Sequence, residues 1–175
     1  LDNSLKRLGV DCVEIYYVHR RDQNIPIEEV TQTLSDFVKS GKIKQIGYSE
    51  ISPSSLEKAN SIHNVAAVQS EYSLSTRYPE LGLIQKLQKL KATLIAFSPL
   101  GRSLLTDKPH SFKKAQTIAF LKGNPRFLEP NLSLNIQITS KFREYALDNS
   151  MSAAQLSLSW LLKKNKNLIP IPGTR

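Results

Sequence analysis

Six side chains that can bind a ligand stand at, or just after, the ends of predicted strands. They are His19, Ser49, Glu50, Gln69, Phe97 and Ser98. Imidazole, hydroxyl, carboxylate and amide groups form hydrogen bonds to ligands, and an aromatic ring offers a flat apolar surface. A helix-like segment follows each strand, and a parallel α/β barrel collects its active site at the carboxyl ends of its strands. The spacing therefore predicts one shared site at one edge of a parallel sheet.

The elements that must position this site alternate along the chain. Short runs rich in Val, Ile and Tyr indicate strands, and apolar residues three and four positions apart indicate helices. The predicted strands cover residues 10–18, 43–48, 65–68, 93–97 and 168–171. The predicted helices cover residues 1–8, 26–40, 53–60, 79–91, 136–147 and 153–162. The pattern predicts an α/β fold built from about five βα units.

Two segments refine this prediction. Residues 13–18 are apolar on both faces of the strand apart from Glu14, and burial on two faces is typical of a parallel sheet covered by helices. The connection from Pro99 to about Pro130 is rich in Gly, Pro and Lys. Connections of this length in a compact domain are usually functional or disordered.

The length of the chain limits the architecture. Its 175 residues fit a single domain over 1–175, but a (β/α)₈ barrel normally needs about 250. Five strands joined by right-handed crossovers form an arc, and an arc leaves two open edges that isolated proteins rarely tolerate. The sequence therefore predicts an incomplete TIM-barrel fold from which strands are missing.

Composition narrows the class of partner. The net charge of +9 comes from lysines scattered over predicted helices, without a nucleic-acid-binding motif. This favours a solvated basic surface with some attraction for an anionic cofactor over nucleic-acid binding. No segment approaches the ~20 apolar residues of a membrane span, so no membrane association is expected.

The cysteine and histidine residues bear on the cellular location and on metal binding. The single cysteine, Cys12, fits a reducing, cytoplasmic location and is expected in or beside a buried strand. His63 and His110 lack acidic or cysteine neighbours at ligand spacing, so no metal site is predicted.

Seven segments, in order along the whole chain, resemble the aldo-keto reductase family. They are SLKRLG (4–9), IYYVHR (15–20), KIKQIGYSE (42–50), QSEYSL (69–74), IAFSPLGR (95–102), AAQLSLSWLL (153–162) and IPIPGTR (169–175). Each motif alone has moderate specificity, whereas their shared order is specific. The resemblance implies a (β/α)₈ barrel that reduces aldehydes and ketones with NADPH.

The family's catalytic tetrad is an Asp, a Tyr, a Lys and a His. Only the histidine has a counterpart here, His19, which would polarise and orient the substrate carbonyl. The other three lie on earlier strands of the family's barrel, and Tyr16 and Tyr17 do not replace the tyrosine because they lie inside the strand before His19. We therefore expect reductase activity from the intact protein and no turnover from these 175 residues alone.

The resemblance also implies a set of NADP(H)-binding residues. They are Ser49, Glu50, Gln69, Phe97, Ser98, Pro99, Leu100, Arg102, Lys108, Gly173, Thr174 and Arg175. Ser49 and Gln69 would hold the nicotinamide carboxamide, because an amide needs both a donor and an acceptor. Phe97 would stack on the nicotinamide ring. The segment 98–102 would lie over the pyrophosphate, and the segment 173–175 would begin the 2′-phosphate site.

The loop after Phe97 departs from the family pattern at two positions. Ser103 and Asp107 stand where the family frequently has glycine, while Lys108 resembles a residue that reaches the phosphates in some branches. A carboxylate near a pyrophosphate is unfavourable unless the side chain of Asp107 turns outward.

Two other functions compete with the reductase. One is a non-catalytic NADP(H)-binding regulatory subunit, similar to the potassium-channel β-subunit branch; that branch lacks the histidine found here at His19. The other is a basic fragment associated with nucleic acid, which only the net charge favours. We predict a small-molecule carbonyl substrate; the sequence does not predict which carbonyl compound binds, nor the oligomeric state.

Overall fold

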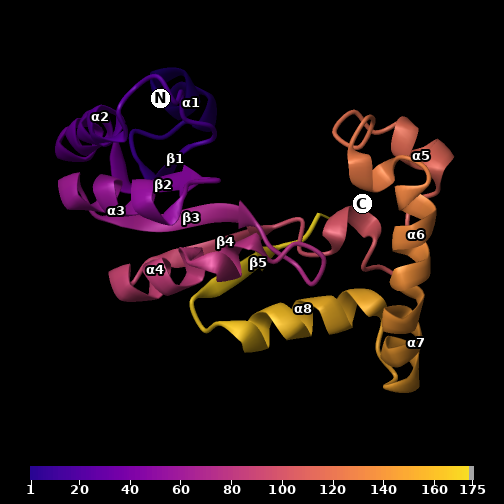
Figure 1. Ribbon diagram of the computed structural model, residues 1–175. Helices are drawn as coiled ribbons and strands as arrows, with labels where there is room; N and C mark the ends of the chain where they lie inside the picture. The colour runs from indigo at the N-terminus through magenta and orange to yellow at the C-terminus, as the bar shows by residue number, and fades with distance from the viewer. Residues whose placement is uncertain (174–175) are drawn as a thin grey trace. The chain divides into compact units, whose positions relative to one another are not determined.

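A computed structural model of the chain describes residues 1–173 (Figure 1). The chain divides into two compact units. The sheet unit comprises Leu1–Glu71, Tyr78–Phe97 and Asn167–Ile169. The helical unit comprises Tyr72–Arg77, Ser98–Lys166 and the described residues from Pro170 onward. The single domain expected over residues 1–175 stays a prediction.

The sheet has five strands in the order β1-β2-β3-β4-β5 (Figure 1). They are β1 (Val13–Val18), β2 (Ile43–Ser49), β3 (Val65–Glu71), β4 (Thr93–Phe97) and β5 (Leu168–Ile171). The pairs β1/β2, β2/β3 and β3/β4 are parallel. Next to β4, the Leu94 N–H donates to the Asn167 carbonyl at 3.0 Å. Sequential order with parallel pairing confirms the predicted incomplete barrel.

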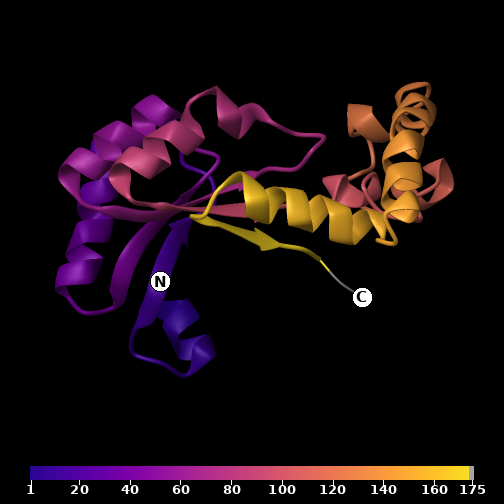
Figure 2. The same cartoon turned by 90° about the horizontal axis from the view of Figure 1, so that it is seen from below.

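Helices cover one face of this sheet (Figure 2). The sheet unit contains α1 (Asp2–Leu8), α2 (Ile27–Lys39), α3 (Pro53–Ile62), the 3-10 turn η1 (Tyr78–Leu81) and α4 (Leu83–Leu90). Each of α2, α3 and α4 contacts the strand that follows it. The predicted cap of α3 is confirmed, because the Ser52 hydroxyl accepts from the Ser55 N–H at 3.1 Å.

One predicted helix is interrupted. Residues 79–91 form η1 and α4 in place of a single helix, because Gly82 between them has a φ of 131° that helical backbone does not allow. The helix α4 ends at Lys91, which adopts the left-handed conformation with a φ of 55°. The Lys91 position is one that helices usually fill with glycine.

The core lies between the sheet and its helices. Ile46, Tyr48, Val68 and Leu94 are buried on the helix-facing side of the strands. The first strand differs from the prediction, because the apolar residues of β1 are only half-buried. Within the described residues β1 pairs with β2 alone, so its other edge lacks strand neighbours that would cover it. Cys12, just before β1, is likewise half-buried.

The helical unit corrects the prediction for the long connection. It contains η2 (Gly101–Ser103), α5 (Phe112–Gln116), η3 (Pro125–Phe127), α6 (Asn131–Ile138), α7 (Ser140–Asp148) and α8 (Ala153–Lys164). The connection is not disordered, because Leu104, Ala115, Leu121 and Phe127 form a buried cluster with Leu132. Its apolar residues are too widely spaced for a helical period to show, so sequence alone did not reveal this core.

The last helices are close to prediction. Residues 131–148 form two helices, α6 and α7, joined at Thr139, where one helix over 136–147 was predicted. Ser152 and Gln155 form a capping box at the start of α8, as the predicted cap requires. Among residues 1–173, no helix has both the length and the apolar character that crossing a bilayer requires.

Candidate functional site

Three of the predicted cofactor residues share one face of the sheet. In the strand register Ser49 pairs with Gln69, and Phe97 pairs with Glu71, two residues further along β3. Side chains two apart on a strand point to the same face. Ser49, Gln69 and Phe97 therefore lie on the face opposite the helix-covered core. Gln69 was predicted to follow its strand, but β3 continues to Glu71, so Gln69 lies within it.

His19 lies at the same end of the sheet. It follows β1 directly after Val18 and is exposed. Tyr17 is its neighbour two residues earlier, with its ring against Gly47 of β2. Burial raises the pKa of the Tyr17 phenol, the opposite of the shift that favours proton donation near neutral pH. This agrees with the prediction that Tyr17 is not the catalytic tyrosine.

Arg20 joins the ends of β1 and β2, a contact that the sequence analysis missed. Its Nη1 lies 2.7 Å from the His19 carbonyl oxygen and 3.0 Å from the Ser49 hydroxyl. A cation directly after a strand-end histidine was the only sequence signal for this bridge.

Glu50 joins β2 to β3. Its backbone has a φ of 52°, and its N–H donates to the Gln69 carbonyl at 2.9 Å. Its Oε1 accepts from the Glu71 N–H at 2.7 Å. The Glu50 carboxylate is thus occupied by backbone, and it holds the ends of two strands together beside the predicted carboxamide site.

A polar pocket of about 230 Å³ opens beside these residues. It is lined by Arg20, Arg21, Gln23, Ile27, Tyr48, Ser49, Glu50, Ile51, Ser52 and Ser55. At its base the Tyr48 hydroxyl and the Thr31 hydroxyl share a hydrogen bond of 2.8 Å. Burial raises the pKa of Tyr48, so its phenol stays protonated at neutral pH.

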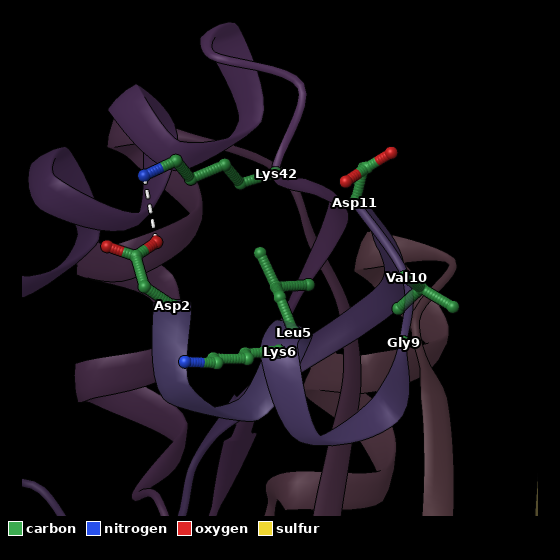
Figure 3. Close-up of a pocket in the computed structure, with 7 residues that line it drawn as sticks. All are labelled: Asp2, Leu5, Lys6, Gly9, Val10, Asp11 and Lys42. Carbon is green, nitrogen blue, oxygen red and sulfur yellow. Dashed lines mark hydrogen bonds and ion pairs between the residues drawn. The ribbon is translucent and has the colours of Figure 1, made fainter.

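A second pocket, of about 400 Å³, lies at the opposite end of β1 (Figure 3). Asp2 and Lys42 point toward one another across it, and their ion pair measures 2.8 Å. The hydrogen bond from Lys42 lowers the pKa of the Asp2 carboxyl. None of the predicted site residues lines this pocket. In parallel α/β barrels this end of the strands serves stability, so the candidate site is the one at the carboxyl ends.

The segment predicted to lie over the pyrophosphate belongs to the helical unit. Ser98, Gly101, Arg102 and Ser103 have φ values of 49°, 58°, 56° and 91°. The Gly101 N–H donates to the Ser98 carbonyl at 2.9 Å and the Ser103 N–H to the Leu100 carbonyl at 3.2 Å, so this segment forms tight backbone turns. A Cβ at Gly101 would meet the Ser75 hydroxyl at 2.7 Å, which explains the glycine.

The other residues of this segment are fixed by neighbours within the helical unit. The Pro99 carbonyl accepts from the buried Ser157 hydroxyl at 2.9 Å. The guanidinium carbon of Arg102 lies 5.8 Å from the centre of the Phe120 ring. Leu100 is half-buried, while Lys108 is exposed.

The Asp107 carboxylate contacts the start of α8. Its Oδ1 accepts from the Ala153 N–H at 2.9 Å, at the first residue of α8. A carboxylate at a helix N-terminus is stabilised by the unpaired N–H groups there. The negative charge of Asp107 is thus used within the helical unit.

The remaining predictions concern the C-terminal residues and a metal site. Gly173 is exposed, whereas the predictions for Thr174 and Arg175 lie outside the described residues. In the described part of the chain, no three His, Cys, Asp or Glu side chains gather closely enough to hold a metal ion.

Comparison with known proteins shows the family of this chain. A sequence profile of the Aldo/keto reductase family matches residues 1–175. The aldo-keto reductase yakc [NADP(+)] of Schizosaccharomyces pombe is 38% identical over 181 residues, covering 100% of this chain and 52% of its own length. The chain thus spans about half the length of this curated relative.

Solved structures show the same fold. The glycerol dehydrogenase of Gluconobacter oxydans has a TM-score of 0.84 at 24% identity, over 99% of this chain and 53% of its own. An aldo/keto reductase from Klebsiella pneumoniae in complex with NADP and acetate has a TM-score of 0.71 at 24% identity, over 99% and 52%. With a family match over its whole length, this chain belongs to the aldo/keto reductase family.

Proposed function

We propose that the protein is an NADPH-dependent oxidoreductase that reduces aldehydes and ketones to alcohols. In this proposal the chain contributes the nicotinamide-binding residues and the catalytic histidine His19. The observation that carries it is the placement of Ser49, Gln69 and Phe97 on one sheet face at the strand ends, where His19 also lies. Membership of the aldo/keto reductase family supports the same reaction class.

The residues present fit a nicotinamide group. Ser49 and Gln69 are paired across neighbouring strands, which lie about 4.8 Å apart. A hydroxyl and an amide at that spacing supply the donor and the acceptor that a carboxamide needs. Phe97, two residues further along the same face, offers a flat apolar surface. When bound, the reduced nicotinamide supplies the hydride.

The residues of this chain would then bind the cofactor and orient the substrate carbonyl. The Ser49 and Gln69 side chains fix the carboxamide, and Phe97 excludes water from the ring. The His19 imidazole donates a hydrogen bond to the carbonyl oxygen of the substrate, which stabilises the negative charge that develops there. Arg102 and Lys108 supply positive charge for the phosphates.

The test is an NADPH-oxidation assay on the protein expressed from its complete reading frame, with a panel of aldehydes and ketones. We expect saturable turnover, and we expect His19→Gln to lower kcat by about 10²-fold or more while leaving the NADPH dissociation constant unchanged. His63→Gln is the matched control, since His63 ends α3 and lies outside the site.

Absence of turnover with every carbonyl compound would overturn the proposal. Turnover that His19→Gln leaves unchanged would remove His19 from the mechanism. The regulatory-subunit alternative predicts NADPH binding without turnover, so the same assay separates the two functions. The expected partner is a small carbonyl compound, and a cytoplasmic setting is supported by the single cysteine.

A further inference from the structure

Arg20 contacts the His19 backbone and the Ser49 side chain with a single nitrogen. Its Nη1 donates to the His19 carbonyl at 2.7 Å and to the Ser49 Oγ at 3.0 Å. Ser49 is buried, with 9% of its surface exposed. Arg20 therefore reaches across from the end of β1 to a buried hydroxyl at the end of β2.

The direction of this hydrogen bond fixes the role of the hydroxyl. A guanidinium group can only donate, whereas a serine hydroxyl has one O–H donor and two acceptor lone pairs. Arg20 occupies one lone pair of Ser49 and leaves the O–H and the other lone pair available. Within residues 1–173 no acceptor takes that hydrogen.

We propose that Arg20 is a positioning residue that turns the Ser49 O–H away from its own side and so favours its donation to the nicotinamide carboxamide. The carboxamide oxygen then faces Ser49, and its NH₂ group faces the Gln69 side chain on the neighbouring strand. This inference rests on the proposed function, in which Ser49 and Gln69 bind the carboxamide. It adds a residue that touches neither cofactor nor substrate and acts through Ser49.

Arg21 provides a matched comparison in the same loop. Its Nη1 donates to the carbonyls of Asp22 at 3.3 Å and Ile25 at 2.8 Å. It carries the same charge and lines the same pocket, but its hydrogen bonds hold its own loop. A general attraction of positive charge for the cofactor would act through both arginines, whereas orientation of Ser49 needs Arg20 alone.

The size of the effect has limits. Without Arg20 the Ser49 O–H can occupy about three staggered positions in place of about two, so the loss in affinity is at least about 1.5-fold. Acting through Ser49, Arg20 cannot contribute more than the hydroxyl itself, which forms one hydrogen bond worth about tenfold. We expect Arg20→Met to weaken NADPH binding by between about 1.5-fold and about tenfold.

The experiment is a double-mutant cycle in NADPH affinity, measured by fluorescence titration of the protein expressed from its complete reading frame. The variants are Arg20→Met, Ser49→Ala, the double variant and Arg21→Met. Each is also titrated with 2′-phospho-adenosine diphosphoribose, which lacks the nicotinamide. A thermal melt of each variant checks that it folds.

We expect Arg20→Met to weaken binding of NADPH and not of the ligand without nicotinamide. In the Ser49→Ala background, Arg20→Met should no longer change the NADPH affinity. Arg21→Met should change the affinities for NADPH and for the ligand without nicotinamide by the same factor. The inference is wrong if Arg20→Met weakens the binding of both ligands equally, or if it lowers the NADPH affinity more than Ser49→Ala does. It is also wrong if Arg20→Met still lowers the NADPH affinity in the Ser49→Ala background. If Ser49→Ala weakens NADPH binding and Arg20→Met does not, this inference alone fails. If the unaltered protein binds no NADPH, the proposed function fails as well.

Discussion

At the scale of single residues, neighbours decide where a charged side chain points. Glu50 was expected at the cofactor and Asp107 lies in the predicted phosphate loop, yet both carboxylates accept from backbone N–H groups. A carboxylate gains more from an unpaired N–H at a strand or helix end than from proximity to a phosphate of the same charge. Sequence gives the residue type but not the direction of the side chain, so the hydrogen bond from Arg20 to Ser49 could not be predicted.

Asp107 gives a prediction at this scale. Asp107→Ala removes the acceptor for the Ala153 N–H and should lower the stability of the helical unit by about 1 kcal/mol. Asp107→Asn keeps an oxygen acceptor and should lose less. Urea denaturation followed by circular dichroism measures both variants. Equal stability of Asp107→Ala and the unaltered protein would show that the contact does not stabilise α8.

At the scale of elements, the sequence predicted the alternating strands and helices but not the irregular segments between them. Strand ends were placed within a few residues because β-branched runs are bounded by Gly, Pro and Ser. The break at Gly82 was missed, since the apolar spacing continues across it. The core of the long connection was missed too, because Leu104 and Phe127 meet only through tertiary packing. Local propensity cannot report such contacts.

The C-terminal residue of α4 gives an element-scale prediction. Lys91 has a φ of 55°, which costs a side-chain-bearing residue more than glycine. Lys91→Gly should therefore stabilise the protein by up to about 1 kcal/mol. Lys89→Gly, inside the same helix, should destabilise it by about 1 kcal/mol. Thermal melts compare the two variants; a loss of stability in Lys91→Gly would contradict the assigned cap.

The ion pair between α3 and α4 predicts a pH dependence. Glu57 Oε1 lies 2.6 Å from Lys86 Nζ, and the hydrogen bond from Lys86 lowers the pKa of Glu57. A carboxyl whose pKa is lowered in the folded state stabilises the folded protein at pH values above its unfolded pKa of about 4.3. This stabilisation is lost as the pH falls through the folded pKa. Glu57→Gln should thus be less stable than the unaltered protein at pH 7 and equally stable near pH 3.

Denaturation at both pH values tests this ion pair. Lys86→Met should remove most of the same pH-dependent difference, because Lys86 is the main cause of the lowered pKa and Lys89 contributes less. A stability difference for Glu57→Gln that is as large at acidic pH as at neutral pH would contradict the assignment.

At the scale of the whole molecule, sequence gave the fold class and family, and the structure added the register. Five strands in sequential order were predictable from the alternation of elements, because parallel strands need crossover helices. The pairing of Ser49 with Gln69 was not predictable, since the register depends on a shift between Ile46 and Gly47. That pairing places Ser49 and Gln69 side by side on one face of the sheet.

The most direct test of the central claim is a fluorescence titration with NADPH. We compare the protein expressed from its complete reading frame with Gln69→Leu, a substitution that removes the amide from the shared face and keeps a similar volume. The account predicts saturable binding by the unaltered protein and an affinity loss of about tenfold in Gln69→Leu, the value of one or two hydrogen bonds. No saturable binding, or equal affinity in both proteins, would contradict the assignment of this face to the nicotinamide.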